Sequence, residues 1–296
     1  MHSAGGGLVG DGDARLVGRN VLLRPLVSAD YEMLYLAEHS ESLGPRWRFQ
    51  GATLSPERFR DALWRGVTAQ FVVTEHTSPR PVGLVALYDV DHADQYGYFA
   101  VADLATGGSP TRVAQGAVLF LSYVFNVWPL RKLYAQTAEF NVDQFRGWCG
   151  KLLVEEGRLH EHHYYGGKHW DEYTFALYRE AWLEWEGRVL RPTQATTIAP
   201  GLLTFEAFVA RLALELEISS LDAPKPDIDL ADDLSFDSLT FVAALGAIEG
   251  LGATVDDKAL ATARTLGDLY HLYAIGATDA DCVAAVASGP LDRDHV

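Results

Sequence analysis

A serine at position 238 stands where a covalent group can be attached. The tripeptide Asp237-Ser238-Leu239 lies in the segment LADDLSFDSLTFVAALGAIE and begins an apolar stretch with helix-forming composition. A hydroxyl in the first turn of a helix lies at the surface beside acidic neighbours and can accept a bulky group there. Asp-Ser pairs are also common as plain helix caps, so the tripeptide alone leaves both interpretations open.

The residues around Ser238 extend this signal over a whole domain. An apolar first helix (FEAFVARLALEL), a long loop, the pattern L-x-x-D-L-x-x-D-S-L, a second helix and the opening TLGDLY of a last helix follow in order. From 201 to 276 the segment resembles an acyl carrier protein. The resemblance implies an all-α domain of the four-helix type, in which Ser238 carries a covalent 4′-phosphopantetheine arm.

The carrier resemblance also implies partners. A phosphopantetheinyl transferase installs the arm, which makes the chain a phosphoprotein, and Asp237 and Leu239 are expected to help dock that enzyme. The acidic surface around Asp232, Asp233 and Glu249 is expected to meet basic patches on biosynthetic partner enzymes.

Three sequence segments of the N-terminal part follow one another in an order that is hard to obtain by chance. They are the opening NVLLRPLVSADY, a strand and turn that end at Asn141 in VLFLSYVFNVWPLRKLYAQTAEFN, and EEGRLHEHHYYGGKHWDEYTFALYREAW. Over residues 18 to 183 they resemble the GNAT acyltransferase superfamily, in the branch that includes ribosomal-protein alanine N-acetyltransferases. The resemblance implies an α/β (α+β) fold with a mixed sheet splayed open in its middle. An acyl-CoA or acyl-pantetheine arm would lie in the cleft, with its thioester beside an amine.

The same resemblance assigns a donor site. The strand Gln95–Val101 would bind pantetheine amides through its backbone, and the loop GGSPTRVAQGA would offer N–H groups at a helix start to the CoA pyrophosphate. That loop departs from the family's glycine pattern, so weak binding of CoA is expected, and a plain turn before a helix explains its glycines as well. The residues assigned to the cofactor are Phe99, Ala100, Val101, Arg112, Val113, Ala114, Gln115 and Gly116.

The catalytic acid and base of the family are altered here. Many members use a Glu on the strand before the cleft and a Tyr after the Asn turn, but these positions fall near Gln95 and Trp148. Positioning of the thioester and a backbone N–H at the oxyanion can supply much of the rate without them. The base stays unidentified, with Asp94, His92, Tyr98 and Cys149 as possible substitutes. The candidate catalytic residues are Tyr98, Gln95, Asn141 and Cys149.

The run His160-Glu161-His162-His163 suggests a metal site, because imidazoles at alternate strand positions share a face. A third ligand at a known spacing is missing, and an aromatic hairpin that lines a substrate cleft explains the same residues. No metal is therefore predicted.

Apolar periodicity predicts the elements that position these residues. The expected strands are Asn20–Pro25, Gln70–Thr74, Val82–Leu87, Gln95–Val101, Lys132–Thr137, Arg158–Tyr165 and Tyr173–Arg179. The first expected helix is capped by Ser28 or Asp30 and runs through Glu41. The other expected helices begin at Ser55–Pro56 or run over Ala114–Asn126, from about Val142 to Glu155, and over Leu202–Leu216, Ser238–Glu249 and Thr265–Tyr273.

Composition predicts two globular domains. The chain has 296 residues, of which 48% are hydrophobic and 22% charged. We expect domains at 14–186 and 201–276, a linker at 187–200, and flexible ends at 1–13 and 277–296. Cys149 and Cys282 lie far apart, and the sequence shows neither a leader nor an apolar run long enough to span a bilayer. This predicts a cytoplasmic protein that does not bind membranes.

The negative net charge argues against nucleic acid as a binding partner. The formal net charge is −16, and residues 200–296 contribute −12 of it through 17 acidic and 5 basic residues. Phosphate backbones are repelled by such a surface.

Joining a catalyst to a carrier suggests a function. Our leading hypothesis is the transfer of an acyl group, from acyl-CoA or from the arm on Ser238, to a small-molecule amine in secondary-metabolite biosynthesis. A flexible linker raises the local concentration of a tethered donor toward roughly millimolar. Two alternatives stay open: loading of the carrier with a starter unit from acyl-CoA, and a non-catalytic GNAT-like module that presents the carrier to partner enzymes.

Overall fold

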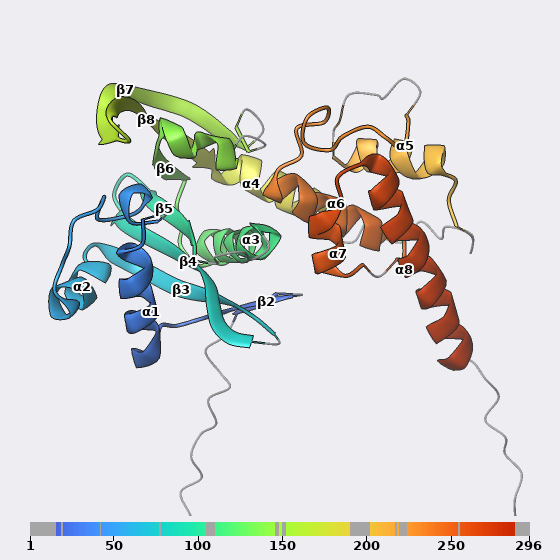
Figure 1. Cartoon of the computed structure of the whole chain (residues 1–296), viewed down its shortest axis with the longest axis horizontal. Coiled ribbons are helices and arrows are strands. Elements are labelled where there is room, and N and C mark those ends of the chain that lie inside the picture. The colour runs from blue at the N-terminus through green and yellow to red at the C-terminus, as the bar shows by residue number, and fades with distance from the viewer. Residues whose placement is uncertain are drawn as a thin grey trace, which may run out of the picture. The chain divides into compact units, whose positions relative to one another are not determined.

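The computed structural model describes residues 16–18, 20–41, 43–76, 78–104, 110–145, 148–149, 152–189, 202–216, 218, 224–253 and 255–287. The chain divides into two compact units (Figure 1), of which the first contains the described residues up to 104, 112–138 and 160–172. The second contains 110–111, 139–159 and the described residues from 173 onward, so the strand hairpin of residues 153–178 is divided between the two units. The predicted flexible N-terminus and residues 190–200 of the predicted linker lie outside the described residues.

One mixed sheet carries the N-terminal part of the chain. Its strands follow the order β1-β2-β3-β4-β5-β6-β8-β7, and β1 to β5 pair with their neighbours in antiparallel fashion. The strands are β1 (Leu16–Val17), β2 (Val21–Arg24), β3 (Val67–Glu75), β4 (Ser78–Asp91), β5 (Tyr96–Asp103), β6 (Lys132–Ala138), β7 (Leu153–Tyr165) and β8 (Lys168–Tyr178).

Helices lie between the strands of the sheet and after the last of them. Those of the first part are α1 (Ser28–Glu38), the short 3-10 helix η1 (Gly44–Arg46), α2 (Pro56–Leu63), α3 (Pro110–Val127), the 3-10 helix η2 (Glu139–Phe145) and α4 (Arg179–Val189). Those of the carrier are α5 (Phe205–Glu215), α6 (Ser238–Gly250), α7 (Asp257–Thr262) and α8 (Leu266–Ala287). Within the part of the chain that the structure describes, no helix is long and apolar enough to cross a membrane.

The sheet opens between β5 and β6. These two strands run parallel, and their recorded register covers three pairs, from Tyr96 opposite Lys132 to Tyr98 opposite Tyr134. Beyond Tyr98, β5 continues for five residues to Asp103, paired along its other edge with β4. A mixed sheet that diverges at this point is the splayed sheet that the GNAT resemblance implies, so the predicted fold class is confirmed.

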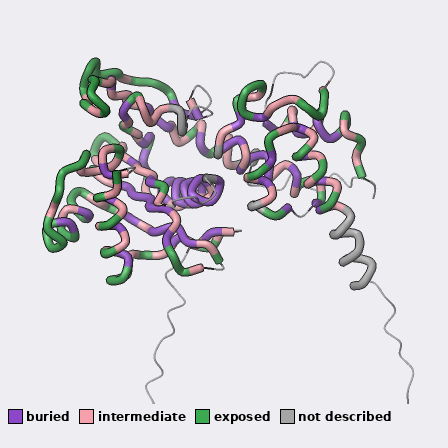
Figure 2. Tube along the Cα trace, viewed as in Figure 1, coloured by how far each residue is buried: buried purple, intermediate pink, exposed green. Residues whose placement is uncertain are grey.

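Helices cover both faces of the sheet. Leu34 of α1 and Phe59 of α2 pack with Val72 of β3, whereas the neighbouring residue Phe71 contacts Phe120 of α3 with ring centroids 6.1 Å apart. Because successive side chains of a strand point to opposite faces, α1 and α2 lie on one face and α3 on the other. Figure 2 shows α3 as largely buried and β7 as largely exposed.

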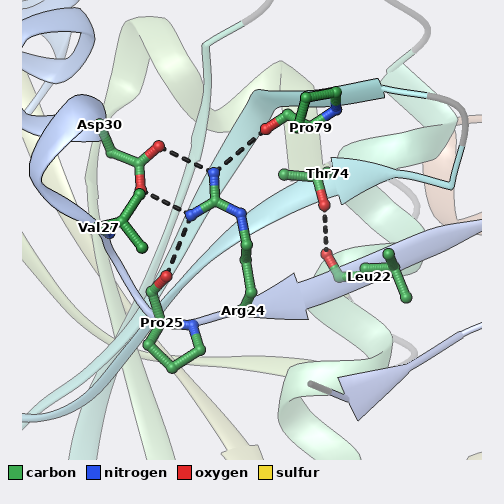
Figure 3. Close-up of polar contacts among 7 residues, drawn as sticks. All are labelled: Leu22, Arg24, Pro25, Val27, Asp30, Thr74 and Pro79. Atoms are coloured by element: carbon green, nitrogen blue, oxygen red, sulfur yellow. Dashed lines mark hydrogen bonds and ion pairs between the residues drawn. The ribbon is translucent and has the colours of Figure 1, made fainter. Parts of the chain in front are cut away.

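An ion pair between Arg24 and Asp30 connects the end of β2 to the start of α1 (Figure 3). Arg24 at the end of β2 donates from both terminal nitrogens to the carboxylate of Asp30, at 2.7 and 2.9 Å, and also to the carbonyl of Pro79 on β4. The N–H of Val27 donates to the same carboxylate. Asp30 is only 4% exposed. Although burial raises the pKa of Asp30, the bonds from Arg24 and Val27 outweigh it and hold the pKa below its usual value.

Replacing Arg24 with methionine should destabilise the fold by about 2–4 kcal/mol, because the substitution leaves a buried carboxylate without its cation. Since the folded-state pKa of Asp30 is lowered, the pair stabilises the fold above the unfolded-state pKa, and this stabilisation is lost as the pH falls through the folded-state value. Urea unfolding at neutral pH and at about pH 3 tests both points. Arg80→Met, at an exposed site on β4, is the matched control.

The carrier is a bundle of four helices. Phe208, Val209 and Leu212 of α5 form one buried core with residues of α6, α7 and α8. The ring of Phe208 stacks on Tyr273 of α8 with centroids 5.0 Å apart. This confirms the predicted all-α carrier fold.

Some predicted elements differ. The helix expected from about Val142 to Glu155 is wrong, because η2 ends at Phe145 and β7 begins at Leu153. α4 extends to Val189, into the span predicted as linker, and α8 continues to Ala287, past the predicted carrier end at 276.

Candidate functional site

Beyond Tyr98, the edge of β5 that faces away from β4 has no recorded strand partner among the described residues. The N–H of Leu104 donates to the carbonyl of Val82 on β4, at 2.9 Å. In an antiparallel ladder every second residue directs its backbone to the same neighbour, so Ala102 and Ala100 also bond toward β4. Phe99 and Val101 therefore direct their N–H and C=O groups away from β4, toward the side on which β6 diverges.

Three tyrosines form a row across the sheet where this edge opens. Tyr88 of β4 lies opposite Tyr98, and Tyr98 lies opposite Tyr134 of β6, so all three share one face. Their ring centroids are 5.7 Å apart for Tyr88 and Tyr98, and 5.4 Å apart for Tyr98 and Tyr134. We call these residues the tyrosine row.

Charged groups surround the tyrosine row. Burial, followed by the neighbouring Tyr96 and Tyr134, raises the pKa of Tyr98, so that its phenol stays protonated. The ammonium of Lys132, a residue only 7% exposed, lies 4.4 Å from the centroid of the Tyr134 ring. Burial also raises the pKa of Tyr88, while the guanidinium of Arg48 opposes the rise.

A buried carboxylate lies behind Arg48. Glu38, at the end of α1, is 2% exposed, and it accepts a hydrogen bond from the N–H of Phe49 at 3.1 Å. Burial raises the pKa of Glu38 to about 7, although the Phe49 N–H and Arg48 oppose the rise. Arg48 itself donates to the carbonyls of Leu63 and Arg65, so the segment between α1 and α2 is held in place beside the tyrosine row.

The raised pKa of Glu38 predicts a pH-dependent stability. The folded state holds a proton on Glu38 that the unfolded state releases at a lower pH, so stability is lost as the pH rises through about 7. We expect a loss on the order of 2–3 kcal/mol between about pH 5 and pH 8. Glu38→Gln keeps an acceptor for Phe49 and should remove this loss, which melting curves across the range would show. Glu41→Gln, at an exposed site, should show the same loss of stability with pH as wild type. If the stability of Glu38→Gln fell with pH as steeply as that of wild type, Glu38 would not be the group responsible.

The start of α3 is less open to an anion than the sequence suggests. The side chain of Arg112 is 10% exposed and forms an ion pair with Glu75 of β3 at 3.2 Å. Val113 and Gly116 pack on the sheet, and a Cβ on Gly116 would lie 2.6 Å from Val73. Thr111 and Arg112 lie in the first turn of α3, whereas Ala114, Gln115 and Gly116 lie deeper in the helix, where the helical ladder uses their N–H groups. Gly107 and Gly108 lie outside the described residues.

The predicted catalytic residues occupy different settings. Gln95 precedes β5 with a positive φ of 58°, and its carbonyl accepts from the N–H of Arg131 at 2.6 Å. Tyr98 lies in the tyrosine row. Asn141 in η2 and Cys149 before β7 belong to the second unit. Burial raises the pKa of the Cys149 thiol, which weakens it as a nucleophile.

The carrier site lies at the start of α6. Asp237 is the N-cap, and its carboxylate accepts from both the N–H and the hydroxyl of Thr240, at 2.9 and 2.8 Å. Ser238 is the first residue of the helix. Ser235, three residues earlier, has a positive φ of 54°, which marks a tight turn into the cap. Leu239 is 4% exposed, so its side chain is not offered to solvent for the docking role predicted for it.

Several polar residues near the opening escaped sequence reasoning. Tyr134 and Lys132 lie on the predicted strand, but the register with β5 is needed to bring them to Tyr98. On the β7–β8 hairpin, His160 pairs with Asp171 and His163 pairs with Glu172. The clustering of histidines was the available signal. It suggested a metal site, which the sequence does not predict, but not the pairing of each histidine with a carboxylate. Among the described residues no group of three or more His, Cys, Asp or Glu side chains is arranged to hold a metal ion.

The carrier region matches a known family. Residues 206–273 match the family model described as phosphopantetheine attachment site, which confirms the predicted carrier domain and implies a covalent phosphopantetheine. A comparison with curated proteins gives no match.

Solved structures similar to the chain are GNAT acetyltransferases. A spermidine N-acetyltransferase from Vibrio cholerae, in complex with CoA and spermine, is 20% identical, with a TM-score of 0.47 over 55% of this chain and 98% of its own. A probable GNAT-family acetyltransferase from Chromobacterium violaceum is 18% identical, with a TM-score of 0.47 over 62% and 98%. A GCN5-related N-acetyltransferase from Brucella melitensis is 21% identical, with a TM-score of 0.47 over 60% and 86%. The chain thus joins a mixed sheet that opens between β5 and β6 to a carrier domain that matches the phosphopantetheine attachment site.

Proposed function

We propose that the protein is an acyltransferase that moves an acyl group from a thioester to a small-molecule amine in natural-product biosynthesis. The observation that carries the proposal is the open edge of β5, in the same chain as a carrier domain. Phe99 and Val101 direct backbone amides toward that opening, where they can bind the amides of a pantetheine arm. A thioester held on this edge would end beside the tyrosine row.

The donor in this proposal is the arm on Ser238. CoA brings a pyrophosphate that needs positive charge, whereas a carrier-bound arm brings one phosphodiester. The guanidinium of Arg112 is largely buried and forms an ion pair with Glu75, so a carboxylate offsets its charge at the start of α3. This pairing favours the carrier-bound donor. The span between the two domains then keeps donor and catalyst together at high effective concentration.

Tyr98 has a role in this scheme. Its raised pKa keeps the phenol in its acid form, so it can donate a proton to the thiolate that leaves when the amide forms. The faces of the tyrosine row favour an ammonium group over a neutral one, which suits an amine acceptor that enters as its cation.

Intact-protein mass spectrometry tests the proposal. A phosphopantetheinyl transferase and acetyl-CoA first install an acetylated arm, and n-butylamine is then added. Loss of acetyl from the protein with formation of N-butylacetamide, faster than from a chain in which Val101 is proline, would support the proposal. Acetyl gain by the unacylated holo form from free acetyl-CoA would support starter loading instead. A protein that does neither would fit a docking module.

A further inference from the structure

The β7–β8 hairpin holds two histidine–carboxylate pairs with different exposure. Nε2 of His163 lies 2.8 Å from Oε2 of Glu172, and the two side chains are 15% and 14% exposed. Nδ1 of His160 lies 3.0 Å from Asp171, but the His160 side chain is 78% exposed. An imidazole in the solvent exchanges protons with water, whereas an imidazole sheltered from solvent can exchange a proton with a bound molecule. The two pairs are therefore a natural comparison within one hairpin.

The sheltered pair belongs to the surroundings of the tyrosine row. Glu172 is one of the charges that act on the phenol of Tyr88, together with Arg48 and Asp89. Tyr88 in turn contacts Tyr98 at the point where the sheet opens. β8 follows β6 in the sheet order, so Glu172 and His163 continue outward from the strand that carries Tyr134. The pair thus lies on the strands beyond β6, on the side of Tyr134 that faces away from β5.

The contact defines which nitrogen of His163 is basic. A carboxylate accepts hydrogen bonds and does not donate them, so in this contact the proton of a neutral imidazole lies on Nε2. Nδ1 then holds the lone pair. Within the described residues the structure records no hydrogen bond to Nδ1 of His163, and the ring of His162 meets that of His163 edge to face at 5.2 Å. A base oriented by a third group is the arrangement that activates nucleophiles in many enzymes.

We propose that His163 is the general base of the reaction and that Glu172 is its positioning residue. The inference rests on the function proposed above. An acceptor enters as R–NH3⁺ and gives one proton to Nδ1 of His163. The free amine attacks the thioester carbonyl, so that a C–N bond forms and the C–S bond breaks. The departing thiolate takes the second proton lost by the nitrogen, directly or through Tyr98, and His163 returns its proton to solvent. The products are an amide, the thiol form of the arm and one proton.

The test uses the full chain, with an acetylated arm on the carrier and n-butylamine as acceptor, and single-turnover rates measured across pH. His163→Gln should lower the rate near neutral pH by about 100-fold. This deficit should shrink at higher pH, where the amine loses its proton unaided. Glu172→Gln should lower the rate by about tenfold, because an amide orients the imidazole less firmly than a carboxylate does. His160→Gln should stay within about twofold of wild type, as a control.

Three outcomes distinguish an error in the assignment of His163 from an error in the proposed acyl transfer. If wild type makes amide and His163→Gln does so with the same rate and pH profile, the base assignment is wrong while the proposed function stands. If wild type makes no amide, both fall. To separate chemistry from folding, His163→Ala is assayed with added imidazole, which should restore part of the rate. Failure of imidazole to restore any rate, in a variant whose melting temperature matches wild type, would overturn the assignment.

Discussion

Replacing Ser238 with alanine is expected to abolish the gain of a phosphopantetheine arm completely. The arm is joined through a phosphodiester to a hydroxyl, and alanine has none. Ser238 is the first residue of α6, directly after the N-cap Asp237. A phosphate bound there lies at the positive end of the helix dipole, which favours it. The measurement is the intact mass of the protein after incubation with CoA and a phosphopantetheinyl transferase.

The same loop offers a matched control. Ser235 is exposed and lies three residues before Ser238, so Ser235→Ala removes a neighbouring hydroxyl without touching the helix start. It should gain the arm as wild type does. A mass gain in Ser238→Ala, or its loss in Ser235→Ala, would contradict the assignment. Transfer from free acetyl-CoA that persists in Ser238→Ala would show in addition that the acyltransferase accepts CoA as donor.

Helices and strands whose apolar residues recur at regular spacing were predictable from the sequence. β2, β3, β5 and β6 alternate or are short apolar runs, and each lies within a few residues of its expected place. The predicted helix from about Val142 to Glu155 shows the limit of such reasoning. Phe145, Trp148 and Leu152 are spaced as on a helix, but Leu152 and Leu153 are buried where the chain turns into β7. α7 has six residues, too few for a period to appear.

The site was predictable where it depends on one segment, and not where it depends on register. Ser238 and the strand Gln95–Val101 follow from local patterns. The tyrosine row requires the pairing of β4 with β5 and of β5 with β6, which no local pattern specifies. The His163–Glu172 pair needs the hairpin through Gly166 and Gly167, whose positive φ values of 62° and 84° turn β7 back onto β8. The polarity of Glu38 gives no hint of its burial. The N–H that donates to its carboxylate belongs to Phe49, in a turn whose position the sequence pattern does not predict.

Replacing Val101 with proline is expected to slow acyl transfer by roughly 10- to 100-fold, with the fold retained. Proline has no N–H, and the N–H of Val101 points to the open side of β5. The ladder with β4 runs through Ala100 and Ala102 and keeps its donors. Proline is tolerated at such an edge. Single-turnover rates from the acetylated carrier to n-butylamine, with melting temperatures beside them, measure the effect.

Two variants of the same strand separate backbone from side chain. Val101→Ala keeps the N–H and should stay within about threefold of wild type, since the proposed bond uses no side-chain atom. Ala100→Pro removes a donor that bonds to β4 and should lower the melting temperature instead. If Val101→Pro transferred acetyl at the rate of wild type, the open edge of β5 would not hold the donor through this amide. If Val101→Ala were as slow as Val101→Pro, the valine side chain would be what the donor needs. Slow transfer in Val101→Pro alone, at an unchanged melting temperature, is the result that only a backbone bond to the arm explains.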